Sequence, residues 1–563
     1  MSRLRCTLLS LGLLISGALQ AAVPDQQAVA TAHPFATDAA HQILDQGGNA
    51  FDAAIAAAAT LAVVEPQGSG LGGGGFFLLR LQQDDGVDYR FLDARETAPL
   101  AAHRDMYRDA DGKVSRSASL NGPLAAGIPG LPAALVHLAE RYGELPLAAS
   151  LASAIEAAEK GFQVSDRYRT LGGFRLDAMR ADTETARIYL RDGELPAEGT
   201  LIKQPELAAT LRALAQHGHD GFYAGQTAQR LVEAVRGAGG IWQQADLDAY
   251  QVVEREPVRW HSQGHQIISA PLPSAGGIAL AGILQGLESL PETERGSVQR
   301  THYLVELMRR VYRDRTALLG DADQVEVPVA RLVSADYAKT LADSISADRA
   351  TPSSELGAPR AFNEGTNTTH FSLIDRHGNA VAATLSVNLP FGAAFTVPGT
   401  GVLLNNEMDD FAADPAGSNA YGLAGSEANA IAPGKRPLSS MTPTMLENDQ
   451  QLAVLGTPGG SRIISMVLLG SLEAIEGQPV EQWVSRPRFH HQYLPDHIQV
   501  EDDAFSPAER AALERLGHRI KPVGRDYGDM QAVNWDKRNG ELSAASDPRG
   551  EGKALARRAL KAD

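Results

Sequence analysis

The chain has 563 residues, of which 44% are hydrophobic and 21% are charged, and its formal net charge is −17. That composition is typical of a large globular protein with a substantial core. The acidic balance argues against nucleic acid and against anionic membrane surfaces as partners.

The first 22 residues have the layout of a secretory signal peptide. Arg3 and Arg5 precede an apolar run at residues 7–19, and small residues follow it. A membrane anchor is the alternative, but the run is shorter than the roughly 20 residues that span a bilayer. The single cysteine, Cys6, lies in this segment, so the exported chain would have no disulfide, no thiolate metal site and no cysteine nucleophile. We therefore expect a periplasmic or secreted protein with residues 1–22 removed.

The elements that follow are helices first and then strands. Helical patterns at 37–46 and 51–64 flank Gly48 and Asn49, which could end the first helix and cap the second. Strands are expected at 76–81 and 89–94. The region 131–346 reads as mostly helical, with its clearest helices at 131–142, 147–160 and 298–318.

A glycine-rich loop at 68–75 contains the spacing G-x-G-x-x-G from Gly68 to Gly73. A dinucleotide-binding loop needs a strand before it and a helix after it, and here the order is reversed. We interpret these glycines as places where backbones approach closely.

The last part of the chain is richer in strands. Residues 370–375 and 380–387 are expected to form a hairpin around the turn at 376–379. A strand at 401–404, a second hairpin near Asn448, helices at 461–475 and 506–516 and a closing strand pair around Gly540 complete the pattern. Sheets sandwiched between helices are therefore predicted.

Thr368 lies where the polar loop 351–366 meets the first strand of that hairpin. If the chain is cut after Asn367, Thr368 gains a free α-amine beside its own hydroxyl, and an adjacent amine can act as the base for that weak nucleophile. Two plainer interpretations are that threonines favour strands and that Asn367-Thr368-Thr369 is an N-glycosylation pattern.

Three other places could bind or react with a substrate. Arg95, at the end of a strand, could grip a carboxylate, although a surface ion pair with Asp93 or Glu96 is the simpler local interpretation. The acids at 407–410 could hold an ammonium or a cation, or form only a polar loop. The glycine pair at 459–460 opens a helix, where backbone N–H groups could form an oxyanion hole.

His490, His491, Asp496 and His497 lie close together in the sequence and could suggest a metal site. Adjacent histidines rarely face one ion, so structural roles are expected and no metal is predicted.

Together these segments resemble the γ-glutamyltranspeptidase family of N-terminal-nucleophile hydrolases. The resemblance covers nearly the whole mature chain and rests on the number and order of its motifs. They include GGNAFDAA at 47–54, EPQGSG at 65–70, TTH at 368–370, LNNE at 404–407, KRPLSSM at 435–441, PGGSR at 458–462, PRFHH at 487–491 and SDPR at 546–549.

The resemblance implies an α+β fold, a four-layer αββα sandwich built from both halves of a self-cleaved precursor. Residues 23–367 would form the large subunit and 368–563 the small one, in one intertwined domain. It also implies a γ-glutamyl acyltransferase and hydrolase that acts on glutathione and related amides, with water, an amino acid or a peptide as acceptor, and without a cofactor.

It further implies a role for each matching residue. Thr368 would be the nucleophile, released by cleavage after Asn367, with Ser386 bonding its amine where the family usually has threonine. Gly459 and Gly460 would form the oxyanion hole. The substrate carboxylate would bind at Arg95, Asn388, Ser439 and Ser440, and the substrate ammonium at Glu407 and Asp410. Tyr421 would belong to a lid over the pocket.

Three alternatives remain. A glutaryl or cephalosporin acylase would share the fold, a dinucleotide-dependent oxidoreductase would rest on the loop at 68–73, and a periplasmic amino-acid binder would leave the chain whole.

Overall fold

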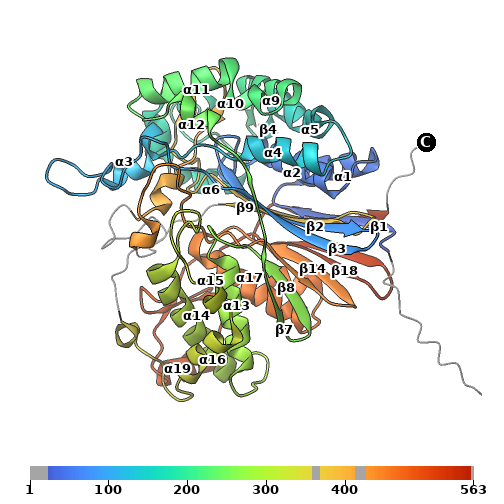
Figure 1. Cartoon of the computed structure of the whole chain (residues 1–563), viewed down its shortest axis with the longest axis vertical. Coiled ribbons are helices and arrows are strands. Elements are labelled where there is room, and N and C mark those ends of the chain that lie inside the picture. Colours follow the sequence, from blue (N-terminus) through green and yellow to red (C-terminus); the bar gives the residue numbers. More distant parts are fainter. Residues whose placement is uncertain (1–22, 358–367, 413–425, 559–563) are drawn as a thin grey trace, which may run out of the picture.

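The computed structural model describes residues 23–357, 368–412 and 426–558. Two sheets lie face to face between two layers of helices (Figure 1), which confirms the predicted four-layer αββα sandwich. In order, the first sheet contains β20 (Lys553–Arg558), β1 (Gln26–Thr31), β9 (Thr369–Ile374), β10 (Ala380–Ser386), β2 (Gly74–Gln83), β3 (Gly86–Ala94) and β6 (Val253–Arg255). The second contains β19 (Glu541–Ser546), β18 (Gln531–Asp536), β14 (Gln451–Gly456), β13 (Thr444–Glu447), β8 (His265–Ser269) and β7 (Val258–Ser262).

The side chains of β2 alternate between the two faces of the first sheet and pack into two different cores. Phe77 and Leu79 belong to the core under the first helical layer, whereas Phe76 and Leu78 belong to the core shared with the second sheet. Successive side chains of a strand point to opposite faces, so a sheet covered on both sides is apolar throughout.

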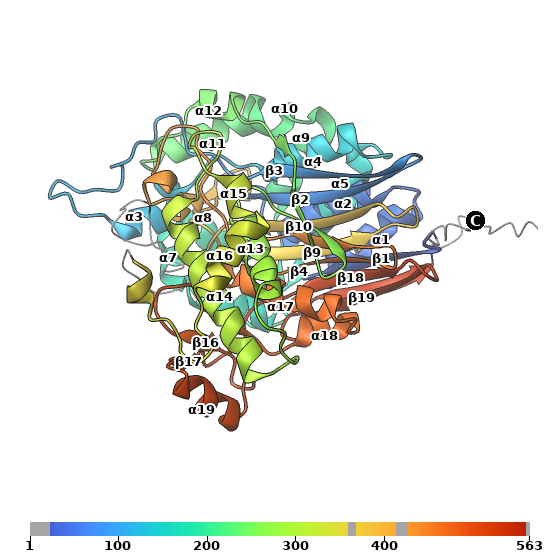
Figure 2. The same cartoon turned by 60° about the horizontal axis from the view of Figure 1, so that its bottom comes forward.

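The helices divide between the outer faces of the two sheets (Figures 1 and 2). The first sheet is covered by α1 (Pro34–Asp45), α2 (Ala50–Val64), α4 (Leu131–Arg141), α5 (Leu147–Lys160) and α9 (Pro205–His217). The second is covered by α13 (Gly276–Glu288), α14 (Val298–Leu318), α16 (Ala335–Asp343), α17 (Ile463–Ile475) and α18 (Val480–Ser485). No helix in these described parts is long and apolar enough to cross a bilayer.

Local signals predicted several boundaries correctly. Asn49 caps α2 by accepting hydrogen bonds from the N–H groups of Phe51 and Asp52, and Asp52 accepts from Asn49 in return. The capping box of Ser506 with Glu509 likewise begins α19 (Pro507–Arg515).

The prediction of a mostly helical region at 131–346 was incomplete, because β6, β7 and β8 lie within it. These strands are short. β6 and β8 pair with distant strands, β3 and β13 respectively, whereas β7 forms a hairpin with β8. The strands β1 and β20, which pair with each other, were also missed.

The glycine-rich loop joins the end of α2 to the start of β2, so a helix precedes it and a strand follows it. A Cβ atom on Gly72 would lie 2.1 Å from the Leu403 carbonyl oxygen, and one on Gly73 would lie 2.2 Å from that of Ser386. The glycines therefore allow close backbone packing, as predicted.

The chain after residue 368 is not a separate unit. β9 and β10 lie between β1 and β2, with β9 bonded to β1 and β10 bonded to β2. Residues from both ends of the chain thus make one continuous sheet, with Thr368 directly before β9, an interior strand of that sheet.

Candidate active site

Thr368 is buried and lines a narrow cavity of about 20 Å³, the room of roughly one water molecule. We call this the nucleophile cavity. It brings together most of the residues predicted for the site, namely Arg95, Ser386, Asn388, Asp410, Ser439, Ser440 and Gly460.

Ser386 ends β10 next to the nucleophile. Its hydroxyl oxygen accepts a hydrogen bond of 2.7 Å from the N–H of Asn388. Asn388 has a φ of 71°, and its side-chain amide donates to the Asn406 carbonyl oxygen at 2.9 Å. A short polar side chain tolerates this left-handed conformation better than a branched one. The turn after β10 therefore holds both side chains at the wall of the cavity.

Arg95 lies at the end of β3 and is only 1% exposed. Its guanidinium pairs with Glu407 at 2.7 Å and with Asp410 at 2.6 Å, and Glu96 lies 3.6 Å away. The simpler sequence interpretation, a surface ion pair, was therefore wrong: the arginine is buried among three acids. We call these four residues the Arg95 cluster.

The Arg95 cluster has more acids than its arginine can neutralise. The carboxylate oxygens of Glu96 and Glu407 accept no hydrogen bond from the described residues, although both are buried. Burial raises the pKa of Glu96 to about 7 and that of Glu407 well above its usual range, against the lowering effect of Arg95 in each case. Such carboxylates have acceptor capacity left for a substrate ammonium.

The acids are positioned by a short helix, η3 (Glu407–Asp410), that follows Asn405. The Asn405 side chain accepts from the N–H of Glu407 at 3.0 Å and donates to the carbonyl oxygen of Gly72 at 2.6 Å. The segment predicted as either a binding site or a polar loop is thus buried and attached to the glycine-rich loop.

Ser439 and Ser440 also line the nucleophile cavity. The Ser439 hydroxyl accepts from the N–H of Met441 at 3.1 Å, and the Ser440 hydroxyl accepts from Arg315 at 3.2 Å. Arg315, on α14, was missed by sequence reasoning because nothing nearby distinguishes it from other helical arginines. Burial lowers its pKa to about 10, so it stays charged at neutral pH.

The glycine loop, residues 457–460, leads into η5 (Gly460–Arg462) and then α17. Gly459 and Gly460 have φ values of 145° and 59°, which favour glycine. Neither amide N–H donates a hydrogen bond within the described parts of the chain. Donors at a helix start that have no internal acceptor are suited to an oxyanion.

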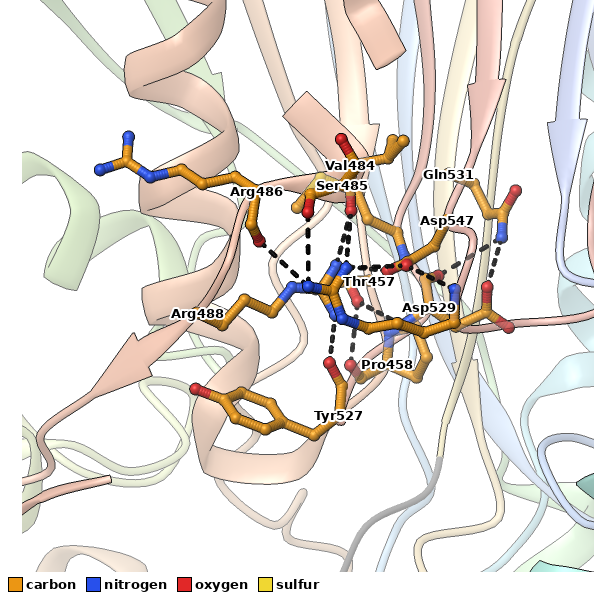
Figure 3. A network of polar contacts seen from close by, with 12 residues as sticks. Thr457, Pro458, Val484, Ser485, Arg486, Arg488, Tyr527, Asp529, Gln531 and Asp547 are labelled. Carbon is orange, nitrogen blue, oxygen red and sulfur yellow. Dashed lines mark hydrogen bonds and ion pairs between the residues drawn. The ribbon is translucent and has the colours of Figure 1, made fainter. Parts of the chain in front are cut away.

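Figure 3 shows the network that anchors this loop. The Thr457 hydroxyl donates to the Pro458 carbonyl oxygen at 3.0 Å and accepts from the N–H of Asp529 at 3.1 Å. Arg488 bonds to Asp547 and to the Tyr527 carbonyl oxygen. Buried ion pairs with such hydrogen bonds fix the backbone around the glycines.

A second charged group lies near Thr369, the neighbour of the nucleophile, and was not predicted. Thr369 donates to Glu65 at 2.7 Å, Glu551 accepts from the Arg167 N–H at 3.0 Å, and Arg167 pairs with Asp529 at 3.5 Å. We call Arg167, Glu65, Asp529 and Glu551 the Arg167 cluster. Burial raises the pKa of Asp529 to about 8.

The remaining sequence predictions concern the cleavage site, the lid residue and the histidines near residue 490. Asn367 and Tyr421 lie outside the described residues. His490 is buried and hydrogen-bonded with Ser465 at 2.8 Å, and His491 lies 3.4 Å from Asp496. Within the described residues no cluster of histidine and acidic side chains could hold a metal ion.

Comparison with known proteins agrees with this geometry. The family model described as Gamma-glutamyltranspeptidase matches residues 36–557. The chain is 42% identical to a glutathione hydrolase proenzyme of Pseudomonas sp. strain A14, covering 87% of this chain and 86% of the relative. It is 41% identical to the protein of the same name from Pseudomonas aeruginosa, covering 97% and 98%. Among solved structures, a cephalosporin acylase from Bacillus halodurans is 26% identical with a TM-score of 0.83, covering 98% and 99%.

Proposed function

Because the chain belongs to the gamma-glutamyltranspeptidase family, we propose that it is a γ-glutamyl hydrolase and acyltransferase that acts on glutathione and related amides. We propose further that a precursor cleaves itself between Asn367 and Thr368, which gives subunits of residues 23–367 and 368–563. The observation that carries the proposal is that Thr368, Arg95 and Asp410 line one cavity, and that Arg95 is paired there with Asp410 and Glu407.

The proposed reaction has two steps. The Thr368 hydroxyl attacks the γ-carbonyl carbon, the C–N bond breaks, and the hydroxyl proton passes through the Thr368 amine to the leaving amine. Water or an amine then attacks the ester, and its proton returns by the same route to the Thr368 oxygen. The N–H groups of Gly459 and Gly460 would stabilise the oxyanion in both steps.

The Arg95 cluster supports selection of a glutamyl group. The substrate α-carboxylate would pair with Arg95, assisted by Asn388, Ser439 and Ser440. The α-ammonium would lie between Glu407 and Asp410, both of which pair with Arg95 in this structure. Binding would thus exchange one set of ion pairs for another, and the small cavity would widen as Arg95 separates from its acids.

The acids of the Arg95 cluster also favour a γ-glutamyl enzyme over a glutaryl or cephalosporin acylase. A glutaryl group carries a carboxylate but no ammonium, so it would leave Glu407 and Asp410 unpaired, which is costly for buried charges. The rate of hydrolysis of γ-glutamyl-p-nitroanilide should therefore exceed that of glutaryl-p-nitroanilide by at least about 100-fold, which corresponds to roughly 2.7 kcal/mol. Equal rates would favour the acylase.

Export is the remaining part of the proposal. We propose that residues 1–22 direct the chain to the periplasm or the medium and are removed there. Cell fractionation with N-terminal sequencing of the large fragment checks this independently of activity.

The decisive test of the nucleophile is Thr368→Ala. We expect an uncleaved chain on denaturing electrophoresis and no turnover of the anilide. N-terminal sequencing of the wild-type small fragment should begin at Thr368, and a start at Thr369 would move the nucleophile by one residue. A cleaved and active Thr368→Ala protein would refute the assignment.

A further inference from the structure

A second cavity, of about 270 Å³, is lined in part by Pro458 and Gly459 of the glycine loop and has no role in the reaction as described so far. It is much larger than the nucleophile cavity. Its lining includes Gly459, whereas the nucleophile cavity is lined by Gly460. The two cavities are thus lined by adjacent residues of one loop, whose Cα atoms lie about 3.8 Å apart.

The second cavity has one cation that the protein does not use. Arg525 is exposed and makes no ion pair within the described residues; its guanidinium lies over the ring of Phe174, with 5.3 Å to the ring centroid. Phe174 is itself 60% exposed, which is unusual for such a large apolar side chain. An arginine stacked on an aromatic ring keeps its N–H groups available at its edge.

The other arginines of the cavity are already committed. Arg549 pairs with Glu501 at 2.7 Å and with Asp547 at 3.1 Å, and Arg167 belongs to its own cluster. Acids also line the cavity, among them Asp526. Mixed charges favour a ligand that carries one carboxylate and one amine over a dianion.

Resting on the proposed function, we propose that the second cavity binds the α-carboxylate of the peptide part of the reaction, through Arg525. That part is the leaving dipeptide in the first step and the accepting amino acid or dipeptide in the second. A γ-carbonyl held at the glycine loop, with its glutamyl end beside Arg95, directs its other substituent past Gly459 and into this cavity. By microscopic reversibility the accepting amine reaches the ester along the same path.

The atoms of the second step balance without another reagent. The accepting nitrogen forms the new C–N bond, the bond from carbon to the Thr368 oxygen breaks, and one proton passes from the nitrogen to that oxygen. Arg525 takes no part in bond making; it positions the acceptor by its carboxylate.

The test compares glycylglycine with glycylglycinamide as acceptors, with γ-glutamyl-p-nitroanilide as donor. We expect the wild-type enzyme to prefer the free carboxylate, and Arg525→Gln to reduce that preference roughly 10-fold or more. Arg525→Lys should recover part of it, because it keeps the charge without the fork of donors. A second comparison, of glutathione with its C-terminal amide as donor substrates, shows whether the leaving dipeptide uses the same contact with Arg525.

A matched control is Arg331→Gln. Arg331 is also exposed and also lies over an aromatic ring, that of Tyr337 at 4.7 Å, but it is not part of the second cavity. It should keep the wild-type preference. An unchanged preference in Arg525→Gln, or no preference in the wild-type enzyme, overturns the inference while the proposed function stands. A wild-type enzyme that does not release p-nitroaniline at all refutes the proposed function instead.

Discussion

Arg95 and Arg167 are two largely buried arginines near the nucleophile, each surrounded by three acids, but their acids are held differently. Around Arg95, two of the acids, Glu96 and Glu407, accept no hydrogen bond from the described residues. The Arg95 guanidinium lies 3.6 Å from Glu96 and 2.7 Å from Glu407.

Around Arg167, each acid has a hydrogen-bond donor besides the guanidinium. Glu65 accepts from the Thr369 hydroxyl, Glu551 from a backbone N–H, and Asp529 from Gln531 at 2.8 Å. Buried acceptors with fixed donors hold a structure in place, whereas buried acceptors without donors are costly unless a ligand completes them. The comparison therefore assigns binding to the Arg95 cluster and support to the Arg167 cluster.

The largest expected effect is on activity, for Arg95→Gln. Loss of the cation removes the partner of the substrate carboxylate, so kcat/KM for γ-glutamyl-p-nitroanilide should fall about 100- to 1,000-fold, or roughly 3–4 kcal/mol. Arg95→Lys should recover only part, because one ammonium cannot face both Glu407 and Asp410 as the fork does. Steady-state kinetics on fully cleaved protein measures this, and a loss below tenfold would contradict the assignment.

Arg167→Gln should reduce stability more than activity. It leaves Asp529 and Glu65 with less compensation, and we expect the free energy of unfolding to fall by about 3 kcal/mol. Anilide turnover per folded molecule should fall less than tenfold. Urea unfolding together with kinetics measures both, and an activity loss like that of Arg95→Gln would erase the distinction between the clusters.

Thr369→Val tests the contact between the Arg167 cluster and the residue next to Thr368. The variant keeps the shape but removes the hydroxyl that donates to Glu65, so we expect a loss of about 2 kcal/mol of stability. Self-cleavage should still yield a fragment that begins at Thr368. A failure to cleave would show that the Arg167 cluster acts in processing and not only in support.

The smallest effect is a change in pH dependence, for Glu96→Gln. Since the pKa of Glu96 is raised to about 7, the ionised form that attracts the donor ammonium accumulates as the pH rises through 7. The KM of wild-type enzyme for the donor should therefore fall a few-fold across that range. This fall should be absent in Glu96→Gln; if it persists unchanged, another group, such as the Thr368 amine, is responsible.

Stability gives a second measurement on the same variant. The folded protein keeps the Glu96 proton up to about pH 7, whereas the unfolded chain releases it near 4.5. The contribution of Glu96 to stability should thus decrease as pH rises from about 4.5 to 7. Thermal melting across that range should show a shallower decline in Glu96→Gln than in wild type.

The sequence predicted what depends on near neighbours. The cap of α2, the hairpin of β9 and β10 and the glycine pair that opens a helix are each encoded within a few residues. It did not predict β7 and β8, which are short strands that form a hairpin with each other. They join the second sheet only because β8 pairs with β13, nearly 180 residues further along the chain. The resemblance to a family supplied roles for the site residues that local patterns left open.

By itself, then, the sequence determined the hairpin that follows Thr368 and, through the order of its motifs, the resemblance that makes Thr368 the proposed nucleophile. The hairpin follows from short-range patterns. Only the tertiary structure decided which charges meet. Asp410 reaches Arg95 across 315 positions of chain, and Asp529 reaches Arg167 from the far end of the protein. No local pattern encodes such contacts, because the energy of a buried charge depends on what surrounds it in space.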